Sequence, residues 1–398
     1  MSRKMSLGAT IMLMAMTAAV AVTVTMIYAM RVFNVNLSDY TQRIAIYKKL
    51  SAVDNLVRTQ YIGAVDSGTL TDDVIRGYIA GIGDSHAAYY DASTYSKTQL
   101  GLQGKGVGIG VNIIENTDGN IKVVSVMSGS PAQKAGLKDG DIITEIGSNT
   151  VISLGYENAI NLLRGNTGTT AQFTVLRGGK PLPFSIVRKQ FDMQTVHAHM
   201  INNTGFIRID EFDENTAAQF TAAIKSLDSK GALSFVFDLR NNPGGEVEAA
   251  AKMLEQLLPA GPIVRVRYKD GKSQVLYSSD GKQELKVPMV VLVNSGTASA
   301  AELFTAALRD YNKAKIIGTK TYGKGTMQKY YELSDGSAVK FSVAYFDPPV
   351  GANFDGKGIE PDISVTLSQA KTDNFYELTD AQDDQLQAAL TYLAALSS

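Results

Sequence analysis

The stretch Val290–Asp310, VVLVNSGTASAAELFTAALRD, decides the fold class of this chain. It completes a continuous apolar run, 287–293, which is typical of a buried strand, and a turn containing Gly296 follows. The next residues place their apolar side chains on one face of a helix: Ala300, Leu303, Phe304, Ala307 and Leu308. Ser299 stands where that helix should begin, beside unpaired backbone N–H groups and the positive end of the helix dipole. A serine in this position is either a helix cap or a nucleophile.

Two similar strand–turn–helix units precede this stretch. The strand Gly205–Ile209 is followed by an amphipathic helix at Thr216–Leu227. The buried strand Ser234–Leu239 runs into the turn RNNPGG, 240–245, and then into another helix. Because repeated βα units pack as helices on a sheet, residues 190–370 are predicted to form an α/β layer fold.

Residues 101–189 have a different pattern, which predicts a separate and mainly β module. A Gly-rich strand start, GVGIGV at 106–111, precedes a hairpin turn at Asn116–Asn120. Such a turn at a strand edge can capture a peptide carboxylate while the peptide adds a strand, although the letters alone also fit a nucleotide loop. The candidate peptide-binding residues are Gly106, Val107, Gly108, Ile109 and Gly110.

Arg164, which ends the predicted helix Tyr156–Leu163, has two interpretations. It links the module to the α/β core when peptide binds, or it caps the C-terminus of the helix at the surface. The residues alone do not favour either interpretation.

The composition excludes several classes of site. The chain has 398 residues, a formal charge of −1 and no cysteine. The near-neutral charge gives no reason to expect a nucleic-acid partner, and the lack of cysteine removes disulfides, thiolate metal sites and a Cys nucleophile. Only three histidines are available for a triad or a metal site, and His86 in GDSHAAYY is expected to be structural. We expect no metal and no cofactor.

The N-terminus carries an apolar segment. Arg3 and Lys4 precede an uncharged run, Met5–Met30, which is long enough to span a ~30 Å hydrocarbon core as a helix. The basic flank predicts that the N-terminus stays in the cytoplasm. A cleaved signal peptide with a site at Ala19-Val20-Ala21 is the alternative, but the run is longer than a usual signal core, so we favour an uncleaved anchor. In either case the remaining chain faces outward.

Lys324 lies in the loop Tyr322-Gly323-Lys324-Gly325, between two glycines that let the backbone pass close to another element. A lysine between glycines is usually a solvated turn residue. The letters GTKTYGK, 318–324, also fit a phosphate loop, but a strand pattern follows where that loop needs a helix, so this interpretation fails. The third interpretation makes Lys324 the base for Ser299, with Gln328 placed to reach back over it.

Four sequence blocks carry a resemblance to one enzyme family. They are DLRNNPGG at 238–245, GTASAAE at 296–302, YGKGTMQ at 322–328 and FDGKGIEPD at 354–362. Together they closely resemble the carboxyl-terminal processing proteases, the tail-specific Ser–Lys peptidases of family S41, whose core is related to the Clp protease and crotonase folds. The 101–189 module, with GVGIGV and SPAQKAGLKDGDIITEIG, resembles a PDZ domain of bacterial proteases. The likeness runs from about Val53 to the C-terminal helix, with small departures at Ala301 and Tyr322.

The resemblance implies a role for each residue of the site. Ser299 would be the nucleophile, Lys324 the general base and Gln328 the residue that orients the lysine. The backbone N–H groups of Ala300 and of the Gly244-Gly245 turn would form the oxyanion hole.

The chemistry of these side chains agrees with the implied roles. Free lysine has a pKa of ~10.4, and bringing it to ~7–8 requires roughly 4 kcal/mol of differential stabilisation. Burial supplies such a shift, and a neutral Gln328 does not restabilise the cation as a carboxylate would. Loss of one oxyanion donor costs about 3–4 kcal/mol. Ser295 is expected to be a turn residue, and Glu302 a structural residue that favours the dipole of the first helical turn.

The sequence therefore predicts a membrane-anchored serine endopeptidase that recognises the C-termini of extracytoplasmic proteins through its PDZ domain. A non-catalytic PDZ scaffold with a retained protease-like core is the alternative. The expected partners are proteins or peptides with apolar C-termini and the membrane, and a homo-oligomer is left open. The predicted segments are an anchor at 1–32, a helical region at 33–100, a PDZ domain at 101–189, an α/β protease core at 190–370 and a helical tail at 371–398, in which Asp380–Leu396 is expected to be one helix.

Overall fold

The computed structural model describes residues 7–396 of the chain, which forms two compact units, Met1–Val74 and Ile75–Ser398. The first unit contains the long helix α1 (Leu7–Gln60) and the start of α2 (Ser67–Ala80). Thr10–Tyr28 of α1 has a mean hydropathy of 2.1 and is long and apolar enough to cross a membrane. Such a helix near the N-terminus is compatible with an anchor or a signal peptide. The predicted basic flank, Arg3 and Lys4, lies outside the described residues.

The centre of the second unit is a six-stranded sheet in the order β10-β11-β12-β15-β16-β19. Its strands are β10 (Val196–Ile201), β11 (Thr204–Ile209), β12 (Ser234–Asp238), β15 (Met289–Val293), β16 (Ala314–Gly318) and β19 (Ile363–Ser364). β10 pairs antiparallel with β11, whereas the pairs from β11 to β19 are parallel. All residues of β12 and β15 are buried, as expected for central strands that are covered on both faces.

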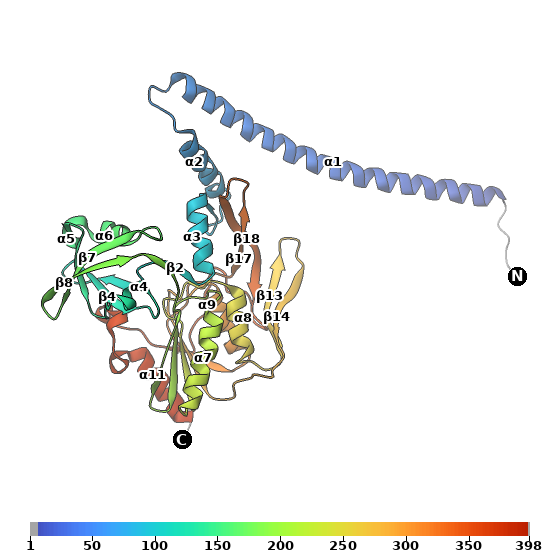
Figure 1. Ribbon diagram of the computed structural model, residues 1–398. Coiled ribbons are helices and arrows are strands. Elements are labelled where there is room, and N and C mark those ends of the chain that lie inside the picture. The colour runs from blue at the N-terminus through green and yellow to red at the C-terminus, as the bar shows by residue number, and fades with distance from the viewer. Residues whose placement is uncertain (1–6, 397–398) are drawn as a thin grey trace. The chain divides into compact units, whose positions relative to one another are not determined.

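Helices cover both faces of this sheet (Figure 1). On one face, α7 (Thr216–Ser229), α8 (Val247–Glu255) and α9 (Ala300–Asp310) share a core with Phe237 and Val291. On the other face, α11 (Asp384–Leu396) packs its apolar side chains against Val236, Val290 and Leu292, the alternate residues of the same strands. This arrangement confirms the predicted α/β layers.

The C-terminal helix begins later than the sequence predicted. We expected a helix from Asp380, but residues 380–382 form a 3-10 turn, η2 (Asp380–Gln382), and α11 begins at Asp384. The cause is the Asp383 carboxylate, which accepts the N–H groups of Gln385 and Leu386 at 3.1 Å each and so caps the helix. Upstream of it lie α10 (Gln369–Asp373) and a second 3-10 turn, η1 (Phe375–Glu377).

An antiparallel sheet flanks the central one. Its strands are β1 (Ala88–Tyr90), β18 (Ala338–Asp347), β13 (Gly261–Tyr268) and β14 (Ser273–Ser279), with β17 (Thr326–Glu332) also paired to β18. The short helix α3 (Ala92–Leu102) follows β1. The alternating sequence after Lys324 therefore forms the strand β17 that its pattern predicted.

The mainly β module has its own sheet and its own hydrophobic core. The sheet order is β3 (Val111–Glu115), β4 (Ile121–Val126), β5 (Ile142–Ile146), β7 (Thr170–Arg177) and β8 (Lys180–Val187), with β6 (Asn149–Thr150) paired to β5. Its helices are α4 (Pro131–Lys134), α5 (Val151–Leu154) and α6 (Tyr156–Leu163). A separate pair joins β2 (Lys105–Gly108) to β9 (Lys189–Asp192).

The predicted single strand at 106–111 is broken in the structure. β2 ends at Gly108 and β3 begins at Val111, because Gly110 has a φ of +83°, which ordinary strand residues do not adopt. The break leaves β3 as an edge strand of the module sheet, with one side open to an added strand.

Candidate active site at the carboxyl edge of the sheet

Three loops leave the same edge of the central sheet because β12, β15 and β16 are parallel neighbours. The carboxyl edge of such a sheet is where α/β proteins bind their ligands. Hydrogen bonds join the three loops: Ala298 N–H donates to Asn242 O at 2.9 Å, and Tyr322 N–H donates to Thr297 O at 3.0 Å. The turn RNNPGG, Ser299 and the Lys324 loop are therefore held together at one place.

Ser299 lies in a strained turn between β15 and α9. Its φ is +56° and its ψ is −118°, a conformation that is uncommon for a residue with a side chain. A sharp strand-to-helix turn of this kind presents the serine at the edge of the sheet in nucleophile elbows. Ser299 and Glu302 form a capping box, in which the Glu302 carboxylate accepts the N–H of Ser299 and the Ser299 side chain faces the backbone N–H of Glu302. The cap interpretation therefore holds for the local geometry, and the strained turn is what favours the additional interpretation of Ser299 as a nucleophile.

Glu302 is fully buried and joins the Ser299 turn to the Lys324 loop. Its carboxylate accepts the backbone N–H of Ser299 at 3.0 Å, of Gly323 at 2.7 Å and of Lys324 at 2.8 Å, and the hydroxyl of Thr321. The sequence suggested only a contribution to the helix dipole. The pattern Ser-x-x-Glu located Glu302 at the third helical position, but nothing in it indicated the partners across the loop.

Lys324 is partly buried, and its surroundings favour the neutral amine. Burial and the positive charge of Lys340 lower the pKa of Lys324, against the opposing effect of Asp84 and Glu302. The flanking glycines lie against residues 353–358: a Cβ on Gly323 would come within 2.7 Å of Gly358 N. The loop therefore holds the lysine in a partly desolvated position that a larger neighbour would not allow.

Gln328 is not hydrogen-bonded to Lys324 in this structure. Its side-chain amide nitrogen donates to Thr326 O at 2.9 Å, to Thr326 Oγ1 at 2.8 Å and to Ser342 Oγ at 3.2 Å. In the part of the chain that the structure describes, no hydrogen bond joins Lys324 Nζ to Ser299 Oγ either. Ser299, Lys324 and Gln328 thus share one region without forming a continuous hydrogen-bond chain.

The RNNPGG turn lies directly against the Ser299 turn. A Cβ on Gly244 would come within 2.8 Å of Ser299 Cβ and 2.9 Å of Ala300 N. The Gly244 N–H is already donated to Asn242 Oδ1 at 2.8 Å. Within residues 7–396, by contrast, no partner accepts the backbone N–H of Gly245 or of Ala300. Two of the three expected oxyanion donors are therefore free to bind a ligand, and the third is not.

The Gly-rich turn of the module opens on a cavity of about 320 Å³ between β3 and α6. Its lining includes Val107, Gly108, Ile109, Gly110 and Arg164. The turn's carbonyls are bonded, since Ile109 O accepts Ala132 N–H and Gly110 O accepts Met127 N–H, while the N–H groups of Ile109 and Gly110 have no partner in the described chain. Such an unpaired N–H pair suits a carboxylate.

Gly106 and Arg164 are the other two module residues that the sequence singled out. Gly106 lies outside this cavity, and a Cβ there would meet the Phe191 ring at 2.5 Å, so its glycine is required by packing. Arg164 is the C-cap residue of α6 and lines the cavity, and its side chain makes no hydrogen bond or ion pair with the core among the described residues.

Ser295 and His86 are the remaining polar residues that were considered from the sequence. Ser295 is exposed in the turn closed by the Thr297 N–H to Asn294 O bond, as expected. His86 lines a cavity of about 630 Å³ beside the Lys324 loop, where burial and the Lys324 charge lower the pKa of its imidazole. The sequence did not indicate that His86 and Asp84 lie near Lys324. Within the described chain, no group of three or more His, Asp or Glu residues could hold a metal ion.

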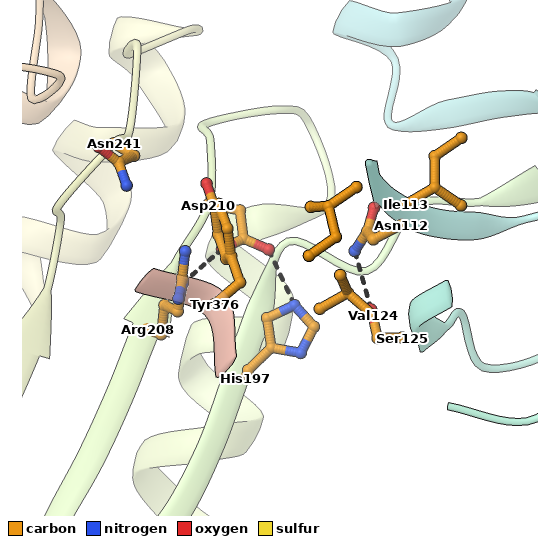
Figure 2. A pocket seen from close by; sticks show the side chains of 10 residues that line it. Asn112, Ile113, Val124, Ser125, His197, Arg208, Asp210, Asn241 and Tyr376 are labelled. Atoms are coloured by element: carbon orange, nitrogen blue, oxygen red, sulfur yellow. Dashed lines mark hydrogen bonds and ion pairs between the residues drawn. The ribbon is translucent and has the colours of Figure 1, made fainter. Parts of the chain in front are cut away.

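A further cavity of about 390 Å³ lies between the module and the core (Figure 2). On the core side, His197 Nε2 and Arg208 Nε each lie 2.9 Å from the Asp210 carboxylate. Burial opposes ionisation, but the His197 hydrogen bond and the Arg208 charge hold the pKa of Asp210 below its usual value. Asn241 of the RNNPGG turn and Tyr376 line the same cavity. The RNNPGG turn therefore reaches the cavity between module and core.

Comparison with known proteins gives this arrangement a context. The profile of peptidase family S41 matches residues 203–365, and that of the PDZ domain matches residues 107–187. Carboxy-terminal processing protease CtpA of Bacillus subtilis (strain 168) is 36% identical over 324 residues, which cover 81% of this chain and 69% of that protein. The protein named "Probable CtpA-like serine protease" of Staphylococcus haemolyticus (strain JCSC1435) is 32% identical over 341 residues, covering 84% and 68%. A solved structure described as a candidate S41 protease of Bacteroides fragilis NCTC 9343 has a TM-score of 0.57 at 18% identity and covers 87% of this chain and 97% of that one, which supports the fold.

Proposed function

The chain belongs to the S41 family of carboxy-terminal processing serine proteases and has a PDZ domain, and on that premise we propose that it cleaves peptide bonds with Ser299 as nucleophile and Lys324 as general base. The observation that carries this proposal is the buried Glu302 carboxylate, which accepts the N–H of both residues. One fixed group thus sets the relative position of the serine turn and the lysine loop. The strained φ of Ser299 supports the same assignment.

In the proposed reaction, Ser299 Oγ attacks the scissile carbonyl carbon while neutral Lys324 takes the hydroxyl proton. The carbonyl oxygen becomes an oxyanion and accepts the N–H groups of Ala300 and Gly245, which have no other partner in the described chain. Collapse breaks the C–N bond, and Lys324 gives its proton to the leaving amine. Water then attacks the acyl-enzyme ester with Lys324 again as base, which releases the new carboxyl terminus and restores Ser299.

The lowered pKa of Lys324 supports its role as base, since only the unprotonated amine can accept the serine proton. Gln328 is proposed to orient this amine once a client, that is, a protein to be cleaved, is bound. Its amide nitrogen now bonds Thr326 and Ser342, so its oxygen remains available to accept from Lys324. Catalytic hydrogen bonds are often incomplete before the substrate binds, so the contacts among Ser299, Lys324 and Gln328 are proposed to close with the client.

Client recognition is proposed to occur at the PDZ domain, residues 101–189. The client's last residues would add a strand to β3, and the N–H groups of Ile109 and Gly110 would donate hydrogen bonds to the terminal carboxylate. The protease core is proposed to span 190–370, with the helical region 33–100 before it and the tail 371–398 after it. With Thr10–Tyr28 as an uncleaved anchor, the catalytic part faces extracytoplasmic proteins.

The experiment compares cleavage of an unfolded protein with an apolar C-terminus by wild type, Ser299→Ala and Lys324→Ala. Ser295→Ala and Lys320→Ala are matched controls, because Ser295 is an exposed turn residue and Lys320 is an exposed lysine paired with Glu360. The two site variants should lose cleavage and the two controls should keep it. Equal cleavage by all five proteins would overturn the Ser–Lys assignment.

A further inference from the structure

Arg240 is the first residue of the RNNPGG turn and is almost completely buried, with 2% of its surface exposed. All five of its side-chain N–H groups have acceptors. Nε and Nη2 donate to the Asp238 carboxylate at 2.8 and 2.7 Å. Nη1 and Nη2 donate to the Asp383 carboxylate at 2.9 and 2.6 Å, and Nη1 also donates to Gln385 Oε1 at 2.9 Å. Three of these five hydrogen bonds go to Asp383 and Gln385, in a segment more than a hundred residues further along the chain.

The C-terminal segment that holds Arg240 is itself firmly attached. Asp383 caps α11, and α11 packs on the central sheet through its apolar face. Gln385 Nε2 donates to Val365 O at 2.7 Å, which fixes the amide that faces Arg240. The centroid of the Phe375 ring lies 4.7 Å from the Arg240 guanidinium carbon, and the ring covers it. The arginine is therefore clamped between its own strand and the tail.

A short chain of contacts leads from Arg240 to the proposed oxyanion donors. Asn242 follows two residues later, and its side-chain oxygen accepts the Gly244 N–H at 2.8 Å. Its carbonyl accepts the N–H of Ala298, the residue before Ser299, at 2.9 Å. A displacement of Arg240 would therefore move both the Gly244-Gly245 turn and the Ser299 turn. A shift of about 1 Å in catalytic groups is enough to lower a rate by about a hundredfold.

Burial of Arg240 does not by itself explain the second carboxylate. Asp238 alone neutralises the guanidinium with two parallel hydrogen bonds. Asp383, which is also buried, adds a second carboxylate, and this carboxylate accepts the N–H groups of Gln385 and Leu386 at the start of α11 as well. Asp383 therefore joins Arg240 to the cap of α11 and fixes the guanidinium plane from a second side. This geometry gives Asp383 a positional role in addition to its role as a helix cap.

We infer that Asp383 is a positioning residue of the active site, which acts through Arg240 on the turn that supplies the Gly245 oxyanion donor. The inference rests on the proposed Ser–Lys mechanism. It makes the C-terminal segment, far from Ser299 in sequence, part of what aligns the catalytic groups. It also predicts a specific kinetic defect, since an oxyanion hole acts on the transition state and hardly on client binding.

The test uses the full chain with Asp383→Asn and the matched control Asp384→Asn. Asp384 is the next residue, with a half-exposed carboxylate paired to Lys371. Three quantities are measured: kcat and KM on an unfolded client, the affinity for a peptide aldehyde, and the affinity for a free tail peptide. The aldehyde adds Ser299 Oγ to its carbonyl carbon, so its affinity depends on the oxyanion donors, whereas the tail peptide binds without them.

We expect Asp383→Asn to lower kcat and aldehyde affinity by the same factor, about tenfold or more, with KM and tail affinity within twofold of wild type. Asp384→Asn should leave all of them unchanged, and Asp383→Glu should restore part of the loss. Folded Asp383→Asn with wild-type kcat, or with kcat lowered and aldehyde affinity unchanged, overturns the inference.

If Asp383→Asn does not fold, Gln385→Met tests the positional role of this segment instead. It removes one acceptor from Arg240 and keeps the shape of the side chain. We expect a smaller loss with the same pattern, and wild-type values for both kcat and aldehyde affinity would refute the positional role. Failure of wild type to cleave the client or to bind the aldehyde would instead count against the Ser–Lys mechanism itself.

Discussion

The Glu302 carboxylate accepts the backbone N–H of Lys324 at 2.8 Å, across 22 residues of sequence and between two different loops. The same carboxylate oxygen accepts the N–H of Ser299. Because this group is fully buried and fully engaged, the serine turn and the lysine loop cannot move apart without leaving a charge unpaired in the interior. Closing the gap between the Ser299 hydroxyl and the Lys324 amine therefore requires side-chain rotation and small loop adjustments, and no separation of the loops.

The first prediction concerns Glu302→Gln. Glutamine offers one acceptor oxygen, and its NH₂ group would face the N–H donors that the second carboxylate oxygen now accepts. We expect a loss of about 2–3 kcal/mol in the free energy of unfolding, because hydrogen bonds to a buried charge are lost. We also expect kcat to fall by at least tenfold, since the loop that carries Lys324 loses hydrogen bonds that position it. Chemical denaturation and steady-state cleavage measure the two effects.

Glu360→Gln is the control for this prediction. Glu360 is exposed and paired with Lys320 at 2.7 Å, and exposed ion pairs contribute about 0–1 kcal/mol. It should leave both the unfolding free energy and kcat close to wild type. Wild-type kcat in a well-folded Glu302→Gln protein would contradict the linking role of this carboxylate.

The loops that carry Ser299, Lys324 and the RNNPGG turn could be located from the sequence because each follows a recognisable strand, whereas the roles of their residues were implied by the family resemblance and stay a prediction. The α/β layers followed for the same reason, since buried parallel strands and amphipathic helices have distinct periods. The clamp on Arg240 could not be found, because Asp383 and Gln385 belong to an ordinary helix start and only the tertiary fold brings them to the arginine. Likewise, Asp84 and His86 approach Lys324 only because β1 pairs with β18.

The break at Gly110 and the late start of α11 were missed for a more local reason. A glycine is compatible with a strand, and only its φ of +83° reveals the turn. Asp383 was one acidic residue among several near the start of the predicted helix, and the hydrogen bonds that it accepts identify it as the cap.

The second prediction concerns the pH dependence. The pKa of Lys324 is lowered by burial and by Lys340, so kcat/KM should rise with pH as Lys324 loses its proton. Removing the Lys340 charge in Lys340→Met should raise the pKa of Lys324 and move this acid limb to higher pH. Asp84→Asn should move it to lower pH, because the Asp84 charge favours the protonated lysine.

Lys329→Met is the matched control, since Lys329 lies on the neighbouring strand β17 and, like Lys340, sits over a tyrosine ring. It should leave the acid limb in place. A pH–rate profile of kcat/KM for the four proteins decides the matter, and an unchanged acid limb in both Lys340→Met and Asp84→Asn would exclude Lys324 as the titrating base. Lys324 also makes stability depend on pH. Its pKa in the folded protein lies below the unfolded value, so the free energy of unfolding rises as pH increases between these two pKa values.

The third prediction concerns Gly244→Ala. Gly244 has a φ of +100°, and an added Cβ would come within 2.8 Å of Ala298 O and 2.9 Å of Ala300 N. The substitution should push the RNNPGG turn away from Ser299 and displace an oxyanion donor, which is worth about a hundredfold in kcat. Client binding at the PDZ domain should not change, because that cavity is lined by other residues.

Gly271→Ala separates the clash from backbone strain. Gly271 also has a positive φ, +81°, but nothing lies within 4 Å of its added Cβ. It should lose about 1 kcal/mol of stability, like any alanine in this conformation, and keep wild-type kcat. If Gly244→Ala and Gly271→Ala lowered kcat equally, the close approach of Gly244 to Ala300 would not contribute to catalysis.

The last prediction concerns the client's C-terminal carboxylate. The N–H groups of Ile109 and Gly110 are unpaired in the described chain, while the carbonyls of the same turn are fixed by Ala132 and Met127. The turn therefore offers free hydrogen-bond donors, which suit an anion. Its carbonyls are already engaged, so it is poorly suited to the NH₂ group of an amide, which is itself a donor. A client peptide with an amidated C-terminus should therefore show a KM raised by about tenfold, with kcat nearly unchanged, because the scissile bond meets the same catalytic groups.

Two measurements make this outcome specific. A peptide whose amide is placed on an internal side chain, with a free C-terminus, should behave as the unmodified client. Titration of the isolated tail peptide onto Ser299→Ala should show the same tenfold preference for the free carboxylate, since binding does not use the nucleophile. Equal affinity for the free and amidated tails would mean that the Gly-rich turn does not read the C-terminus, and that the protease selects its clients by another surface.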